Sequence, residues 1–354
     1  MNNANQRNSQ WKLILGLFVI VLAFLRPTVV LGEETLNFHV TPELPQSQIE
    51  GTASYYNLNL NPGETETLVL MLQNDKEEPI EVKVTAHTAF TNVNGVVEYG
   101  KTAEQADPTL LYSIDELIEP IDTIELAAKE SKRVELTLKM PTDSFEGVLA
   151  GGLRIEEVRQ EEENVDNGES IAIKNEFSYV VGVLARNSRT TVQPDLELLD
   201  VFADQVNYRN VISATLQNFT PTFVNRLEVE ATVQREGEDE VLYEASQSQM
   251  QMAPNSNFNF PISLEGDRFQ SGEYVLNMTA RSGEEEWKWT KKFTIEADEA
   301  RKLNRADVTI DTSTNWWMIG AIGLFLMILA IALYVLLKKR KQKKDNSETG
   351  KGLK

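Results

Sequence analysis

The stretch RVELTLK at residues 133–139 decides the fold class, because apolar and polar side chains alternate along it without interruption. Successive side chains of a β-strand point to opposite faces of a sheet, so this period of two buries one face and leaves the other in water. The same alternation recurs at residues 81–85, 227–233 and 274–279. The body of the chain is therefore predicted to consist of half-buried antiparallel strands.

Turn residues separate these stretches at roughly ten-residue spacing, as in immunoglobulin-like sandwiches. The turns are expected at Asn61-Pro62-Gly63, Asn94-Gly95, Gly237 with Asp239, Ser271-Gly272 and Ser282-Gly283. Residues 107–118 lack the alternation and are expected to form a short helix or an irregular crossover between sheets. The acidic residues 156–170 are expected to form a loop that joins two long strands, 147–155 and 171–185, into a hairpin.

The fold class predicted from these patterns is all-β, with two tandem immunoglobulin-like β-sandwich domains. The boundary falls at residues 190–194, so the first sandwich takes residues 33–188 and the second takes residues 189–305. The core of the first sandwich is predicted to contain Phe38, Leu68, Leu70, Leu72, Val82, Val84, Leu136 and Leu138.

Composition limits the chemistry available to the 354 residues. The net charge of −20 argues against nucleic-acid binding, which needs a basic face to meet phosphates. The absence of cysteine excludes disulfides, thiolate metal sites and cysteine nucleophiles. The two histidines, His39 and His87, are too far apart in sequence to form a helical metal-binding pair.

Charge is distributed unevenly along the chain. The last 17 residues carry a net charge of +6 and the first 32 carry +3, which leaves −29 for the rest. Residues 316–337 form a 22-residue run without a charge, long enough for a helix to cross a bilayer. The alternative reading of this run is a buried core helix.

The borders of this run favour a transmembrane helix. Tryptophans mark its start and basic residues follow its end, so the anchor is assigned to Trp316, Trp317, Leu337, Lys338, Lys339 and Arg340. The basic tail, residues 338–354, is then cytoplasmic, and the acidic body is outside the cell. Residues 306–315 are a polar spacer.

The first 32 residues resemble a secretory signal peptide that forms an N-terminal signal helix. Arg7 and Lys12 precede an apolar run, and cleavage is expected between Gly32 and Glu33. An uncleaved signal anchor is the alternative, because the run extends to Leu31 if Arg26 is tolerated.

No catalytic, metal or cofactor site is predicted. Residues 95–102 match the spacing of a phosphate-binding loop, but they read as a turn and a strand instead of a loop that opens a helix. Carboxylates are so numerous that glycosidase-like pairs arise by chance. Asn164, Asp166 and Glu169 lack the spacing of a calcium loop, and a solvated loop is the simpler interpretation.

Aromatic and amide side chains give the candidate ligand-binding set. It consists of Tyr55, Tyr56, Asn92, Asn94 and Tyr99, with the tyrosines able to stack on sugars or contact a partner. Partly buried strand aromatics are the alternative for the tyrosines. Trp287 and Trp289 are two residues apart, on one face of a strand, and are assigned to the core of the second sandwich instead of a binding platform.

Short sequence segments in the part between the two apolar runs resemble the WxL-interacting protein family of Gram-positive cell surfaces. They occur in order at residues 38–45, 61–68, 91–99, 145–152, 252–258, 272–276 and 287–295, and they are followed by an apolar run and a basic tail. Each phrase alone is weakly specific, whereas their order is distinctive.

The resemblance implies a non-enzymatic, membrane-anchored binding protein. The first domain would bind peptidoglycan and the second a host component such as an extracellular-matrix protein. Surface proteins that carry WxL domains would be partners. A cell-wall glycan hydrolase and a membrane-bound envelope sensor remain alternative functions. The implied location is the cell membrane, with one span and the body within the cell wall.

Overall fold

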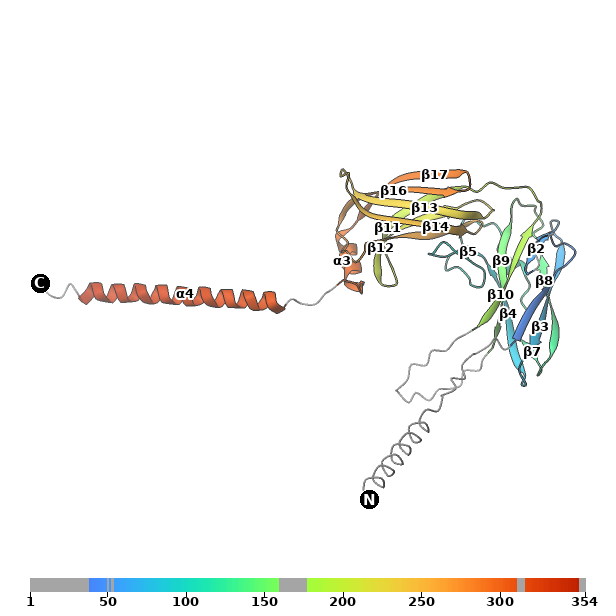
Figure 1. The fold of residues 1–354 in the computed structure, drawn as a ribbon, viewed down its shortest axis with the longest axis horizontal. Coiled ribbons are helices and arrows are strands. Elements are labelled where there is room, and N and C mark those ends of the chain that lie inside the picture. Colours follow the sequence, from blue (N-terminus) through green and yellow to red (C-terminus); the bar gives the residue numbers. More distant parts are fainter. Residues whose placement is uncertain (1–37, 50, 52–53, 159–176, 311–315, 350–354) are drawn as a thin grey trace, which may run out of the picture. The chain divides into compact units, whose positions relative to one another are not determined.

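The computed structural model describes residues 38–49, 51, 54–158, 177–310 and 316–349. The chain forms two compact units (Figure 1). The first unit runs to His87 and also takes in Ile114–Ser144 and Gly151–Ala185. The second unit contains Thr88–Ser113, Phe145–Ala150 and the chain from Arg186 onward. The units therefore alternate along the sequence. Residues Thr88–Ser113 lie between two parts of the first unit in the chain, yet they belong to the second unit.

The first unit is built from two sheets. The three-stranded sheet has the order β1-β3-β8 and the five-stranded sheet has the order β2-β10-β9-β4-β7. The strands are β1 (Phe38–Glu43), β2 (Tyr56–Asn59), β3 (Thr65–Asn74), β4 (Ile80–Thr88), β7 (Ile124–Leu126), β8 (Ser131–Lys139), β9 (Leu149–Glu157) and β10 (Ser178–Arg186). Strands β9 and β10 are neighbours in the sheet, as predicted for the two long strands.

Alternation along the strands produces the core of the first unit. In β8 the inward residues Val134, Leu136 and Leu138 are buried, and the residues between them face outward. All eight predicted core residues are buried, which confirms that the alternating pattern identifies the inward-facing side chains. Burying each such side chain contributes about 1.5–3 kcal/mol relative to leaving it in water.

The sandwich of the second unit consists of two sheets, with orders β11-β12-β15 and β14-β13-β16-β17, and a separate two-stranded sheet of this unit is described below. The strands are β11 (Leu196–Val206), β12 (Arg209–Asn218), β13 (Val224–Arg235), β14 (Val241–Met252), β15 (Ser256–Ser263), β16 (Gly272–Ser282) and β17 (Glu285–Ile295). All the pairings within these two sheets are antiparallel. The body is therefore mostly β, as the all-β prediction requires, although it also contains short helices.

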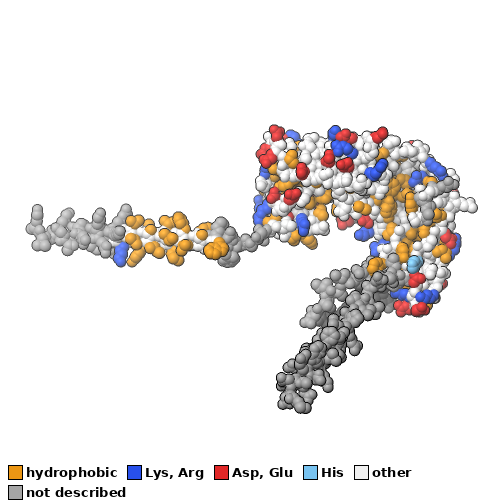
Figure 2. Space-filling view, in the orientation of Figure 1, with side chains coloured by type: hydrophobic (Ala, Val, Ile, Leu, Met, Phe, Trp, Pro, Cys, Tyr) orange, Lys and Arg blue, Asp and Glu red, His pale blue; other side chains and the backbone are white. Residues whose placement is uncertain are grey.

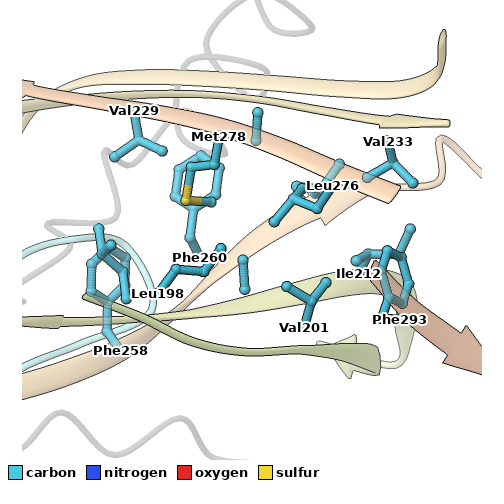
Figure 3. Packing of buried hydrophobic residues seen from close by; sticks show 14 of the residues in the cluster. Leu198, Val201, Ile212, Val229, Val233, Phe258, Phe260, Leu276, Met278 and Phe293 are labelled. Atoms are coloured by element: carbon cyan, nitrogen blue, oxygen red, sulfur yellow. The ribbon is translucent and has the colours of Figure 1, made fainter. Parts of the chain in front are cut away.

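The core of the second unit lies between its two sheets, and Figure 3 shows side chains from both sheets pointing into one apolar layer. Phe260 and Ile212 come from the three-stranded sheet, and Leu276 and Val229 come from the four-stranded sheet. Trp287 and Trp289 are partly buried against this cluster, on one face of β17 as the sequence predicts.

Two tight hairpins set the register of neighbouring strands. Ser282 pairs with Glu285 across a two-residue loop whose first residue, Gly283, has φ of 64°. Arg209 follows β11 through a second two-residue loop, Asn207-Tyr208, in which both residues have positive φ. Primed turns require this left-handed backbone, and glycine adopts it at little cost. The first turn was predicted, and the second was missed because tyrosine is an unusual residue there.

Helices are few among the described residues. Helix α2 (Ile114–Leu117) occupies part of the predicted irregular crossover, and helix α3 (Ala297–Ala306) follows β17. The sequence analysis did not predict α3, whose Ala300 and Leu303 pack against the core of the second unit. Helix α4 (Trp316–Thr349) contains the predicted transmembrane run. The predicted signal segment 1–32 with Gly32 and Glu33, and the centre of the acidic loop, lie outside the described residues.

Helix α4 presents apolar side chains along its described part (Figure 2). Within the described residues, however, no helix combines the length and the mean hydropathy required to cross a membrane.

Thr88–Ser113 packs within the second unit as a docked segment, and this name is used for it below. It contains a small hairpin, β5 (Phe90–Thr91) with β6 (Val97–Glu98). The Thr91 hydroxyl lies 2.7 Å from the Ser256 hydroxyl and accepts the Ala253 N–H at 3.0 Å. These buried contacts join residues that are more than 160 positions apart in sequence.

Asp107 provides the densest polar contacts of the docked segment. Its carboxylate accepts two hydrogen bonds of 2.9 Å from Nε2 of Gln217 and one of 2.5 Å from Nδ2 of Asn257. Thr109 donates its N–H and its hydroxyl to the same carboxylate. Burial alone would raise the pKa of Asp107, but the hydrogen bonds from Thr109, Asn257 and Gln217 outweigh it and hold the pKa below its ordinary value.

At two positions where chain segments of the second unit pack closely, the space beside the backbone admits only glycine. A Cβ added at Gly95 would lie 2.4 Å from the sulfur of Met250, and one at Gly147 would lie 2.1 Å from the carbonyl oxygen of Pro221. Both glycines also have positive φ. A larger residue at Gly95 would have to displace the side chain of Met250, and one at Gly147 would have to displace Pro221.

Leu276→Ala tests the core of the second unit. Leu276 is fully buried, so the substitution is expected to destabilise the unit by about 2–5 kcal/mol, through lost transfer energy and a residual cavity. Denaturant unfolding of the full chain, followed by tryptophan fluorescence, measures the loss. Lys288→Ala is the control, because the Lys288 side chain is exposed on β17 and its ion pair with Glu286 contributes little. Equal losses for both variants would contradict the assigned core.

Asp107→Asn tests the docked segment. The amide cannot accept all the hydrogen bonds of the carboxylate, so a loss of about 1–3 kcal/mol is expected at neutral pH. Because the folded pKa is depressed, this stabilisation is present above about pH 4 and is lost as the pH falls through the folded pKa. The gap between wild type and variant should therefore narrow on acidification.

Thermal unfolding of both chains from pH 7 down to pH 2 measures this gap. Asp239→Asn serves as the matched control, because Asp239 is exposed in a turn of the second unit. A gap that is independent of pH, or as small as that of the control, would refute the role given to Asp107.

Candidate functional site

The five candidate ligand-binding residues are divided between the two units. Tyr55 and Tyr56 belong to the first unit, whereas Asn92, Asn94 and Tyr99 belong to the docked segment of the second. Neither unit holds the five as one cluster.

Tyr56 lies in the core of the first unit. Its ring is fully buried, and its hydroxyl donates a 2.5 Å hydrogen bond to the carbonyl oxygen of Val69. Burial raises the pKa of the Tyr56 phenol well above its ordinary value, so the group stays protonated and remains a donor. Its contacts are those of a packing residue.

Tyr55 directly precedes strand β2 and is half-buried. A Cβ added at Gly182 would be only 3.5 Å from Cβ of Tyr55, so the tyrosine lies against the glycine of β10. The adjacent pair of tyrosines thus has one ring inside the sandwich and one partly in solvent, as the alternation of a strand requires.

Asn92 and Asn94 form the turn of the docked segment. Oδ1 of Asn92 accepts the N–H groups of Asn94 and Val96, and its Nδ2 donates to Glu98 at 2.7 Å. The carbonyl oxygen of Asn94 accepts Nε2 of Gln247 at 2.9 Å. The Asn92 side chain is therefore engaged in building the hairpin.

The Asn-Gly turn also explains why residues 95–102 do not form a phosphate-binding loop. Gly95 has φ of 66° in the turn, and residues 97–98 form β6. No helix starts at the end of this stretch, within the described residues. The N–H groups that a phosphate needs at a helix N-terminus are not assembled here.

Both histidines lie in the first unit, and each contacts another side chain of that unit. His39 is largely exposed and contacts the Asp75 carboxylate through Nδ1. Nε2 of His87 lies 2.8 Å from the Thr85 hydroxyl. Burial lowers the pKa of His87 below its ordinary value, with Arg154 acting in the same direction and Asp115 opposing.

A cavity of about 340 Å³ opens at one edge of the first unit. Its floor is apolar and consists of Val84, Ile118 and Leu136, which are all buried. Because β4 and β8 belong to different sheets, the cavity enters the sandwich between them. The sequence pattern does not reveal this site, since the site depends on where a crossover passes a strand edge.

The rim of the cavity carries charges of both signs. Lys83 from β4 supplies an ammonium group, and Asp115 and Glu119 from the crossover supply carboxylates. All three residues are exposed. The arrangement suits a small ligand with an apolar centre and opposite charges at its ends.

In the part of the chain that the structure describes, no three or more His, Asp or Glu side chains come together in a way that could hold a metal ion. Asn164, Asp166 and Glu169 lie outside the described residues.

Asp107 is the second feature that the sequence analysis missed. The phrase Asp107-Pro108-Thr109 carries a local signal, because an aspartate before such a turn accepts the backbone N–H two residues later. Its partners Gln217 and Asn257 are 110 and 150 residues away, and nothing in the local sequence identifies them.

Comparison with known proteins places both domains of the chain in one family. The sequence model described as "WxL Interacting Protein, peptidoglycan binding domain" matches residues 38–157. The model described as "WxL Interacting Protein, host binding domain" matches residues 168–305. No curated relative matches the sequence.

Solved structures with some similarity include bacterial fimbrial chaperones. The Salmonella enterica SafA pilin in complex with the SafB chaperone is 12% identical, over 74% of this chain and 98% of that chain, with a TM-score of 0.28. The CsuC–CsuE chaperone–tip complex of Acinetobacter baumannii is 14% identical, over 66% of this chain and 93% of that chain, with a TM-score of 0.29.

A PapD-like domain of human CEP192 is 14% identical, over 47% of this chain and 99% of that chain, with a TM-score of 0.26. Similarity at these levels supports no inference about this chain. The family is shown by the two sequence models, which match in order and together cover most of the chain. The chain thus belongs to the WxL-interacting protein family and carries its peptidoglycan-binding domain followed by its host-binding domain.

Proposed function

We propose that this chain is a membrane-anchored scaffold of the cell surface that holds WxL-domain proteins at the peptidoglycan. The observation that carries the proposal is the ordered match of a peptidoglycan-binding and a host-binding domain at residues 38–157 and 168–305. A peptidoglycan-binding domain implies a location at the cell wall. Both matched domains are binding domains, which supports a binder over an enzyme.

The anchor is proposed to be residues 316–337, held at the membrane surface by Trp316 and Trp317 and by the basic residues Lys338, Lys339 and Arg340. The support is the 22-residue uncharged run in the sequence and the exposed apolar side chains of its described part. Basic residues after the run favour a cytoplasmic tail at 338–354. Residues 1–32 are proposed to be the signal peptide that exports the body.

The exported body is proposed to consist of the sandwiches 33–188 and 189–305 with a spacer at 306–315. The beginning of that spacer packs against the second unit, since the Asp307 carboxylate accepts the Asn210 N–H at 2.7 Å. Such a contact is suited to a body that must be held near its anchor.

The acidity of the body supports a choice of partner. Residues outside the two basic ends carry a net charge of −29, which repels anionic wall polymers and attracts basic patches on proteins. WxL-domain proteins are the proposed permanent partners, and a host extracellular-matrix protein is the proposed outer ligand of the second domain. Electrostatic attraction of this kind accelerates association and weakens with salt.

Binding without cleavage is the first expected result. The purified full chain in detergent micelles should cosediment with peptidoglycan sacculi and should release no muropeptides, because its wall-facing domain is a binding domain. Pelleting measures the binding, and chromatography of the supernatant measures release. Released muropeptides would favour the alternative of a wall hydrolase, and an unbound chain would refute peptidoglycan binding.

Salt dependence is the second expected result. The affinity of the full chain for a purified WxL-domain protein should fall several-fold between about 50 and about 500 mM NaCl, because the Debye length shortens from about 14 to about 4 Å. Isothermal titration measures it, and sucrose at matched osmolarity is the control. A constant affinity would show that the acidic charge serves solubility and does not attract the partner.

A further inference from the structure

We propose that the cavity at the edge of the first unit binds the peptide stem of peptidoglycan, and that the glycan strand does not occupy it. The inference rests on the proposed binding of peptidoglycan and names the part of the polymer that is recognised. All of its lining residues lie within 38–157, the stretch that matches the peptidoglycan-binding domain.

The position of the cavity on a strand edge is the first argument. The ladder between β4 and β7 covers only Ile80–Val82, and the cavity begins at the next residue, Lys83. From Lys83 to Ala86 no strand of the described chain pairs with β4 on this side. Backbone groups on such an edge can pair with an extended peptide, which a sugar chain cannot imitate.

The chemistry of the lining is the second argument. The floor is formed by aliphatic side chains, and aromatic residues are absent from the described lining. Sugar rings commonly stack on aromatic faces, so this lining does not suit a glycan strand. The stem peptide contains alanine methyl groups, which match a small aliphatic floor such as that made by Val84 and Leu136.

The charges of the rim are the third argument. Lys83 stands on the β4 side of the cavity, and Asp115 and Glu119 stand on the crossover side. A stem peptide carries free carboxylates and the amine of a diamino acid, so each sign of charge on the peptide meets an opposite charge in the rim. The N-acetylated disaccharide unit carries no amine that could contact the rim carboxylates.

The size of the cavity agrees with this occupant. About 340 Å³ is at the low end of the range of roughly 300–1,000 Å³ that small-ligand sites occupy.

The test compares ligands that contain only one part of the polymer. The full chain in detergent micelles is titrated with a soluble stem tetrapeptide, with a muramyl tripeptide, and with peptide-free glycan strands. The two peptide ligands should bind with similar affinity, and the glycan should neither bind at the cavity nor compete. Glycan strands that displace the tetrapeptide would overturn the inference.

Two variants act on the cavity itself. Lys83→Glu reverses the charge on the rim, and Ala86→Phe fills the space with a ring. Each should weaken tetrapeptide binding by about tenfold or more, since a charge-assisted hydrogen bond or the occupied volume is lost. Lys139→Glu makes the same charge change at an exposed position of β8 outside the cavity, and it should change the affinity less than about twofold.

Unfolding temperatures of all three variants show whether each is folded, and the charge reversal keeps the test valid should Ala86→Phe fail to fold. Cavity variants that bind the tetrapeptide like wild type would refute the site. Sacculi stripped of stems by an amidase separate the two proposals. A chain that pellets equally with stripped and intact sacculi contradicts only the peptide site, whereas a chain that pellets with neither contradicts peptidoglycan binding altogether.

Discussion

Burial of alternate side chains between two sheets is the constraint on which the described structure depends. The chain has no cysteine, so neither unit can be cross-linked by disulfides. Each unit instead closes an apolar layer, with residues such as Leu136 in the first and Leu276 in the second. A sandwich held in this way loses the positions of its strand edges when the apolar layer opens, because the buried side chains hold the strands in place.

Local pattern was sufficient to predict the strands and much less informative about their partners. The period of two in residues 133–139 predicted both the strand β8 and its inward face, since the alternation is a property of the strand itself. The turn at Asn207-Tyr208 was missed, because the left-handed conformation of a tyrosine is imposed by the pairing of β11 with β12. The structure adds that the Asn92 amide closes a turn, and the predicted ligand-binding role of Asn92 stays a prediction.

The cavity shows the same limit for the candidate site. Its floor joins Val84 and Leu136, which belong to different sheets, and its rim includes a crossover that has no regular pattern. Sequence alternation could identify both floor residues as inward-facing. It could not show that the β7 ladder stops at Val82 and leaves a strand edge beside them. The cavity of this chain therefore lies where the regular pairing of β4 ends.

The docked segment has a consequence for how the chain reaches its native state. Thr88–Ser113 is synthesised long before its acceptors Gln217 and Asn257, which follow by 110 and 150 residues from Asp107. During that interval its polar groups face only water. The second unit can therefore complete its assembly only late in synthesis. The docked segment must pair with residues that are distant in sequence, and closing such long loops costs conformational entropy.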